Sequence, residues 1–118
     1  PGFIKDEDMA GVYSGANCVV LPSWYEGFGF PVLEAMACGV PVAATNRASV
    51  PEIAGPARVF DPANTQLFAD AIRETLQLPL SERAERIRKG FEWVKHFSWQ
   101  RVAKETLAVY GHIAGRTA

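Results

Sequence analysis

The sequence lacks an excess of charge of either sign and lacks a hydrophobic run long enough to cross a membrane. Lys and Arg total 12 while Asp and Glu total 13, so no basic field exists for broad contact with a phosphate backbone. A membrane helix needs about 18 consecutive apolar residues, and the chain does not open on a basic segment followed by a hydrophobic signal core. We therefore expect a soluble, cytoplasmic protein that does not bind nucleic acid.

Cysteine and histidine are also scarce. Cys18 and Cys38 match neither a zinc knuckle nor a CxxC redox pair, so we expect reduced thiols buried as small hydrophobic groups, with no disulfide framework. His96 and His112 have no second ligand at metal spacing and are predicted to be structural or exposed. No metal site is expected.

What the sequence does have is 48% hydrophobic residues in 118, enough for one compact unit over residues 1–118. Apolar, β-rich runs predict strands at residues 18–21, 40–45 and 57–60, and Phe3-Ile4 looks like the end of a further strand whose partners lie upstream. The chain is thus expected to be a fragment, and its open sheet edge predicts self-association.

Helices are predicted between and after these strands. Their signals are helical spacing of apolar residues, N-caps at Asp6, at Asn64 or Thr65 and at Ser98, and stops at Gly39 and Pro79. The expected ranges are about 7–15, 31–38, 50–54, 64–78 and, for the terminal helices, 81–114. Alternating strands and helices predict helices on both faces of a parallel sheet, a partial doubly wound, Rossmann-like α/β fold.

The loop after residues 18–21 is the candidate ligand site, because ligands bind at the carboxyl ends of strands in open α/β sheets. This loop leads into a helix that begins near Pro31. The free N–H groups of Gly27, Phe28, Gly29 and Phe30 and the positive helix end would face a diphosphate, and the glycines permit close approach.

Two carboxylates flank this loop. Glu34 lies about one helical turn after Pro31 and could accept hydrogen bonds from two ribose hydroxyls, while Glu26 could accept from sugar hydroxyls or orient the loop. Alternatives stay open on spacing alone: Gly27 and Gly29 could merely turn the chain, Glu34 could be solvated, and Glu26 could cap the helix.

The whole stretch from Pro22 to Val42, PSWYEGFGFPVLEAMACGVPV, strongly resembles the donor signature of the group 1 (family 4) retaining glycosyltransferases. The similarity extends through residues 46–52, 61–62 and 97–99. It implies the latter part of the C-terminal, donor-binding domain of a two-domain GT-B enzyme. The parent would transfer a hexosyl group, without a metal, from a UDP- or GDP-sugar to a hydroxyl acceptor.

The resemblance also implies residue roles. Glu34 would hold the donor ribose, Glu26 would contact the transferred sugar as the candidate catalytic residue, and the amides of residues 27–30 would contact the sugar and diphosphate. The basic pair that contacts the diphosphate, the base pocket and the acceptor domain would lie in the missing N-terminal part, so the isolated chain is expected to be inactive. A contact of the parent with a membrane surface is kept as an option.

Other residues receive structural interpretations. Arg47 is favoured as a loop salt bridge over a phosphate contact, and Glu52 as a helix cap over a donor contact. The aromatic group Trp93, Phe97 and Trp99 is predicted to pack the terminal helices.

Two alternatives to transfer remain at this stage. One is a non-catalytic nucleotide-binding or interaction module. The other is a nucleotide-sugar epimerase or glycan phosphorylase with the same two-domain architecture.

Overall fold

The computed structural model describes residues 2–115 and arranges three short strands in one parallel sheet. The strands are β1 (Val19–Leu21), β2 (Val42–Thr45) and β3 (Arg58–Phe60), in the spatial order β1-β2-β3. Val20 pairs with Ala43, and Ala44 pairs with Val59. Because all pairs are parallel, the carboxyl ends of the strands meet at one edge of the sheet, and the predicted α/β class is confirmed.

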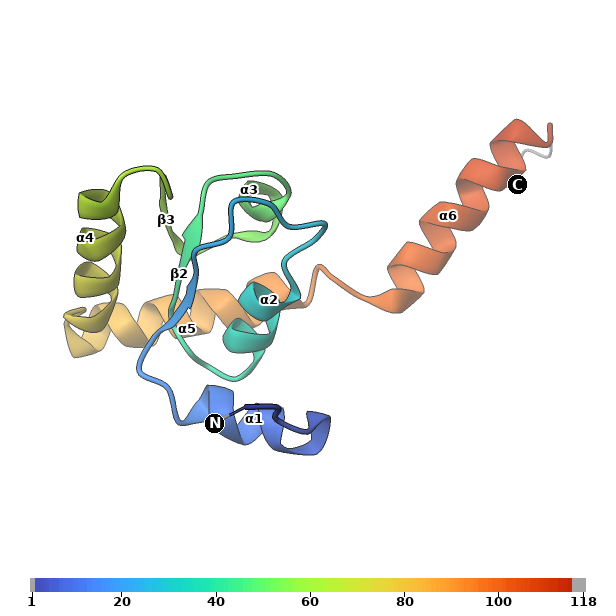
Figure 1. Cartoon of the computed structure of the whole chain (residues 1–118). Helices are drawn as coiled ribbons and strands as arrows, with labels where there is room; N and C mark the ends of the chain where they lie inside the picture. Colours follow the sequence, from blue (N-terminus) through green and yellow to red (C-terminus); the bar gives the residue numbers. More distant parts are fainter. Residues whose placement is uncertain (1, 116–118) are drawn as a thin grey trace.

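Helices cover both faces of this sheet (Figure 1). α4 lies on one side, while α2 and α3 lie on the other, where α5 packs against α2. The helices are α1 (Asp6–Ser14), α2 (Phe30–Ala37), α3 (Val50–Ile53), α4 (Thr65–Leu76), α5 (Leu80–Val94) and α6 (Trp99–Ile113).

The central strand β2 is buried on both faces, which explains why its sequence is apolar without alternation. Val42 and Ala44 belong to the larger core cluster, which includes Val32 of α2. Ala43 belongs to a second cluster with Phe60 of β3 and residues of α4. The two clusters fix the sheet between α2 and α4.

Several predicted helix ends are confirmed. The Asn64 side chain accepts a hydrogen bond from the Leu67 N–H at the start of α4, and the Ser98 side chain accepts one from the Arg101 N–H at the start of α6. Gly39 follows α2 with φ +72°, a left-handed conformation that suits glycine at a helix end.

Phe3 and Ile4 form no strand within residues 2–115, where Phe3 is 91% exposed; the strand partners expected upstream stay a prediction. Two other predictions at the ends of the chain are wrong. Asp6 is the first residue of α1 rather than its cap, since Lys5 occupies that position without a side-chain hydrogen bond. α6 has no buried residue and extends away from the sheet (Figure 1). The Trp99 ring lies 6.3 Å from that of Phe30 between centroids, but Trp99 is 75% exposed and is not a buried packing residue as predicted.

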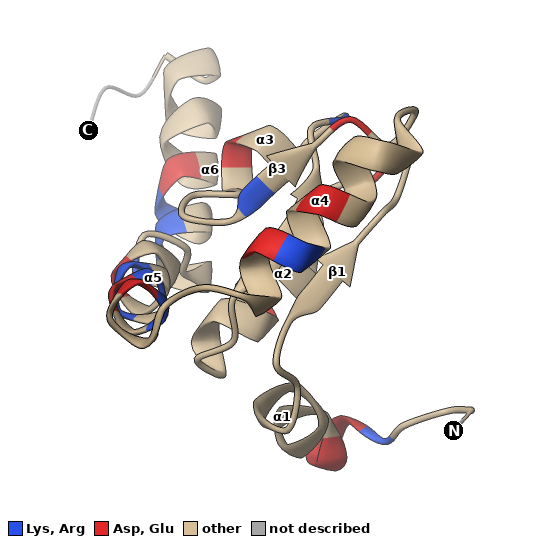
Figure 2. Cartoon of the chain, turned by 90° about the vertical axis from the view of Figure 1, so that its left-hand side faces the viewer, with Lys and Arg blue, Asp and Glu red and all other residues tan. Residues whose placement is uncertain are grey.

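Charges of both signs occur on α4, α5 and α6, whereas α1, α2 and α3 carry acidic residues only (Figure 2). On α5, Arg88 pairs with Glu85 at 2.7 Å, and Lys95 just beyond its end pairs with Glu92 at 2.8 Å. Within residues 2–115, no helix is long and apolar enough to span a bilayer, and no three metal-binding side chains gather in one place.

Candidate functional site

The loop predicted to bind the donor, residues 23–30, is named the donor loop; it leaves the carboxyl end of β1 and enters α2. Gly29 is the N-cap of α2 and has φ +94°, a conformation that L-residues rarely adopt. A Cβ atom on Gly29 would lie 3.0 Å from Cδ1 of Ile53, in α3. Glycine is therefore required at Gly29 by both backbone conformation and close packing, whereas a Cβ on Gly27 would meet open space.

The amides at this helix start are free. Within the described part of the chain, no hydrogen bond uses the backbone N–H groups of residues 27–30, and α2 has no side-chain cap. Pro31, within the first helical turn, has no N–H to donate. Four donors without a partner in the described residues thus lie at the start of α2, where the positive end of the helix dipole favours an anion.

Glu26 is half-buried at the start of the loop. Its Oε1 accepts a hydrogen bond of 2.6 Å from the Ser23 hydroxyl, and its backbone carbonyl accepts one of 2.8 Å from the Ser49 hydroxyl. Since Gly29 is the N-cap and no side chain caps α2, the alternative that Glu26 caps the helix is wrong.

Glu34 lies on the exposed side of α2, yet it is not merely solvated. Its Oε2 accepts a 2.7 Å hydrogen bond from the Tyr13 hydroxyl of α1. Desolvation of the phenol, followed by this bond to Glu34, raises the pKa of Tyr13 to about 12. Tyr13 therefore stays protonated at neutral pH, and its hydroxyl holds one oxygen of the Glu34 carboxylate.

The basic residue nearest the loop is already paired. Arg47 follows β2 and lies 2.8 Å from Asp61, which follows β3. The backbone N–H of Ala63, and then Arg47, hold the pKa of Asp61 below its usual value. The salt-bridge interpretation of Arg47 is confirmed, whereas the capping role predicted for Glu52 is wrong, because α3 has no side-chain cap.

Aromatic rings connect the donor loop to the end of α5. Phe28 lies 4.7 Å from Phe30 and 6.2 Å from Phe97, between ring centroids. Phe97 lies 5.7 Å from Trp93, whose Nε1 donates to the Ile53 carbonyl at 2.9 Å. The predicted packing role of Trp93 and Phe97 is confirmed.

Sequence reasoning missed two residues that hold this site, Tyr13 and Ser49. The Tyr13 hydroxyl donates to Glu34, and the Ser49 hydroxyl donates to the Glu26 carbonyl. Ser49 lies four positions after the carboxyl end of a predicted strand, which is a signal that could have found it.

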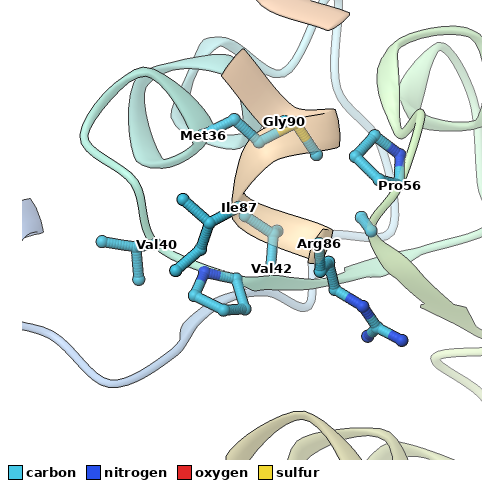
Figure 3. Close-up of a pocket in the computed structure, with 9 residues that line it drawn as sticks. Met36, Val40, Val42, Pro56, Arg86, Ile87 and Gly90 are labelled. Atoms are coloured by element: carbon cyan, nitrogen blue, oxygen red, sulfur yellow. The ribbon is translucent and has the colours of Figure 1, made fainter. Parts of the chain in front are cut away.

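A small, partly open cavity lies elsewhere (Figure 3). Its volume is about 10 Å³, room for one water at most, and its lining includes Met36, Val42, Ile87 and Gly90. Val40, Pro41 and Val42 bring it to the amino end of β2, opposite the edge at which a ligand is expected. We interpret it as a packing gap between α2 and α5, separate from the donor loop.

Comparison with known proteins decides the family. A family model described as "Glycosyl transferases group 1" matches residues 1–93. The chain belongs to the group 1 glycosyltransferase family. The O-antigen chain mannosyltransferase B of Escherichia coli is 41% identical over 110 residues, which cover 92% of this chain and 29% of that protein.

Further relatives agree with this assignment. The MMP alpha-(1->4)-mannosyltransferase of Mycolicibacterium hassiacum is 35% identical, covering 98% of this chain and 29% of its own. A sucrose-phosphate synthase structure from Thermosynechococcus elongatus superposes with a TM-score of 0.83 at 31% identity, covering 99% of this chain and 30% of that one. These neighbours are GT-B glycosyltransferases, so the GT-B expectation is confirmed, and the epimerase and interaction-module alternatives are not favoured. The chain spans under a third of each relative.

Proposed function

We propose that this chain supplies the nucleotide-sugar donor site of a retaining glycosyltransferase. The observation that carries the proposal is the set of free amides at residues 27–30, aimed from a helix start and flanked by Glu26 and Glu34. Because the chain covers 29% of the Escherichia coli relative, the remainder of the parent would supply the base pocket and the acceptor site.

Each group in the site has a task in this proposal. Glu34 accepts hydrogen bonds from the two ribose hydroxyls, and Glu26 accepts from hydroxyls of the transferred sugar. The loop amides and the α2 dipole stabilise negative charge on the diphosphate as its bond to the sugar breaks. In this scheme amides and basic residues, rather than a metal ion, carry that stabilisation.

The donor is proposed to be a UDP- or GDP-hexose, and mannosyl donors are the first to test because two of the relatives are named mannosyltransferases. The acceptor is a hydroxyl group, and the cytoplasmic location predicted above remains part of the proposal.

The ribose role is tested by titrating nucleoside diphosphate against Glu34→Ala in the full-length parent. Loss of a hydrogen-bonded charged group costs about 1.5–3 kcal/mol, so affinity should fall by about tenfold to a hundredfold. Glu82→Ala, on the exposed first turn of α5, is the matched control and should bind as wild type. Unchanged affinity of Glu34→Ala would reject the ribose role.

The Tyr13→Phe variant tests whether the orientation of the Glu34 carboxylate contributes to ribose binding. This variant keeps Glu34 but removes the 2.7 Å hydrogen bond that fixes one of its oxygens. We expect an affinity between those of wild type and Glu34→Ala.

The role of Glu26 is tested by single-turnover rates of Glu26→Ala with donor and acceptor saturating. A lower rate is expected if its carboxylate contacts the sugar in the transition state. A wild-type rate would leave Glu26 as a loop residue held by Ser23.

A further inference from the structure

Ser49 links the donor loop to the next crossover of the sheet. It lies at the N-cap of α3, in the segment that follows the carboxyl end of β2. Its Oγ lies 2.8 Å from the Glu26 carbonyl oxygen and 3.1 Å from the Phe28 carbonyl oxygen. One half-buried hydroxyl therefore contacts two alternate carbonyls of the same loop.

These two contacts determine where the loop amides point. In a planar trans peptide the C=O and the following N–H are directed to opposite sides, and no cis peptide occurs in the part of the chain that the structure describes. With the carbonyls of Glu26 and Phe28 turned toward Ser49, the N–H groups of Gly27 and Gly29 are turned away from it. These are two of the four free donors described above.

Each of these two peptide units has glycine as its second residue, and glycine populates conformations on both sides of φ = 0° with little cost. Without a partner for their carbonyls, rotation of either unit would replace a free N–H in the site with a carbonyl oxygen. A diphosphate would then meet negative rather than positive charge.

The turn before Ser49 is held in an unfavourable backbone conformation, and this is seen separately from the hydrogen bonds of Ser49. Ala48 has φ +50°, which costs an L-residue about 1–2 kcal/mol, and it directly precedes Ser49. Surrounding bonds hold the turn: Arg47 pairs with Asp61, and the Asn46 N–H donates to the Phe60 carbonyl at 2.8 Å. Strain of this kind is typical of segments that position a functional group.

We propose that Ser49 is a positioning residue that directs the amides of Gly27 and Gly29 toward the diphosphate of the donor. This inference rests on the proposed donor site. It adds a residue that touches no ligand itself and acts through the direction of two peptide units.

The experiment compares two ligands on the full-length parent: the nucleoside diphosphate, UDP or GDP, that wild type binds, and the corresponding nucleoside. Ser49→Ala should weaken diphosphate binding by about tenfold, because each charge-assisted hydrogen bond lost costs about 1.5–3 kcal/mol. Nucleoside binding should be unchanged. Ser49→Thr keeps the hydroxyl and should restore diphosphate affinity, and Ser81→Ala, on the exposed start of α5, is the control.

The outcomes distinguish a failure of the Ser49 role from a failure of the proposed donor site. If Ser49→Ala weakens both ligands equally, or if Ser49→Thr fails to restore the diphosphate, Ser49 is only a structural residue and the inference is overturned while the donor site stands. If wild type binds neither UDP nor GDP, the proposed function itself fails and the inference fails with it. Thermal melting of Ser49→Ala within a few degrees of wild type would confirm that the protein stays folded.

Discussion

Helices α2 and α6 are both rich in apolar side chains, but only α2 buries them. α2 has no side-chain cap and has four buried residues, Val32, Leu33, Ala35 and Met36. α6 is capped by Ser98 and has no buried residue. Burying one such large side chain contributes about 1.5–3 kcal/mol, more than the roughly 1 kcal/mol of a cap. α2 can therefore leave its first amides free for a ligand, whereas α6 depends on local signals.

The largest difference between the two helices should come from placing a charge on each. Val32 is fully buried and Val109 is 56% exposed. Val32→Asp buries an unpaired carboxylate and should lower the free energy of unfolding by more than about 4 kcal/mol, whereas Val109→Asp should change it by less than about 0.5 kcal/mol. Chemical denaturation of the two variants measures both values. Similar losses would mean that α6 packs as tightly as α2.

A second test concerns the start of α2. Gly29→Ala forces a side chain into φ +94° and against Ile53, and should cost about 2–3 kcal/mol of stability. Nucleotide affinity in the parent should also fall, because the loop amides shift. Gly27→Ala, where a Cβ meets open space, is the matched control and should cost less than about 1 kcal/mol. Equal costs would contradict the close approach of Gly29 to α3.

The two tryptophans beside these helices offer a smaller contrast. Trp93→Phe removes the Nε1 hydrogen bond to the Ile53 carbonyl and should cost about 1–2 kcal/mol. Trp99→Phe, at the 75% exposed start of α6, should be within about 0.5 kcal/mol of wild type. Equilibrium unfolding followed by circular dichroism compares them. An equal loss in Trp99→Phe would indicate that α6 packs on the body of the protein.

The same contrast explains what the sequence could predict. Local chemistry predicted the strand runs, the caps at Asn64 and Ser98 and the left-handed Gly39, because each depends on a few neighbouring residues. The apolar spacing of α6 predicted a helix but not its burial, since periodicity identifies a face without identifying what covers it. Phe3-Ile4 has the apolar pattern of a strand but pairs with no strand within residues 2–115.

The candidate site likewise has a part that local sequence predicted and a part that it did not. Glu26, Glu34 and the loop amides lie in one continuous segment, so their spacing and the family resemblance predicted them together. The bonds that orient them join residues far apart in sequence: Tyr13 to Glu34 across 21 positions and Ser49 to Glu26 across 23. Such pairs depend on how the crossovers pack, which no local pattern specifies.

The smallest expected effect is the removal of the α6 cap. Ser98→Ala removes the hydrogen bond to the Arg101 N–H, which is worth about 1 kcal/mol. Because a 15-residue helix with no buried residue is marginal, this loss should be local: amide exchange over Trp99–Ile113 should rise about fivefold, with no change in the global unfolding midpoint. Asn64→Ala is the counterpart on α4, which packs against β3, so there the loss should appear in global stability instead. A shift of the global midpoint by Ser98→Ala would show that α6 unfolds together with the core, and the distinction between α2 and α6 would then fail.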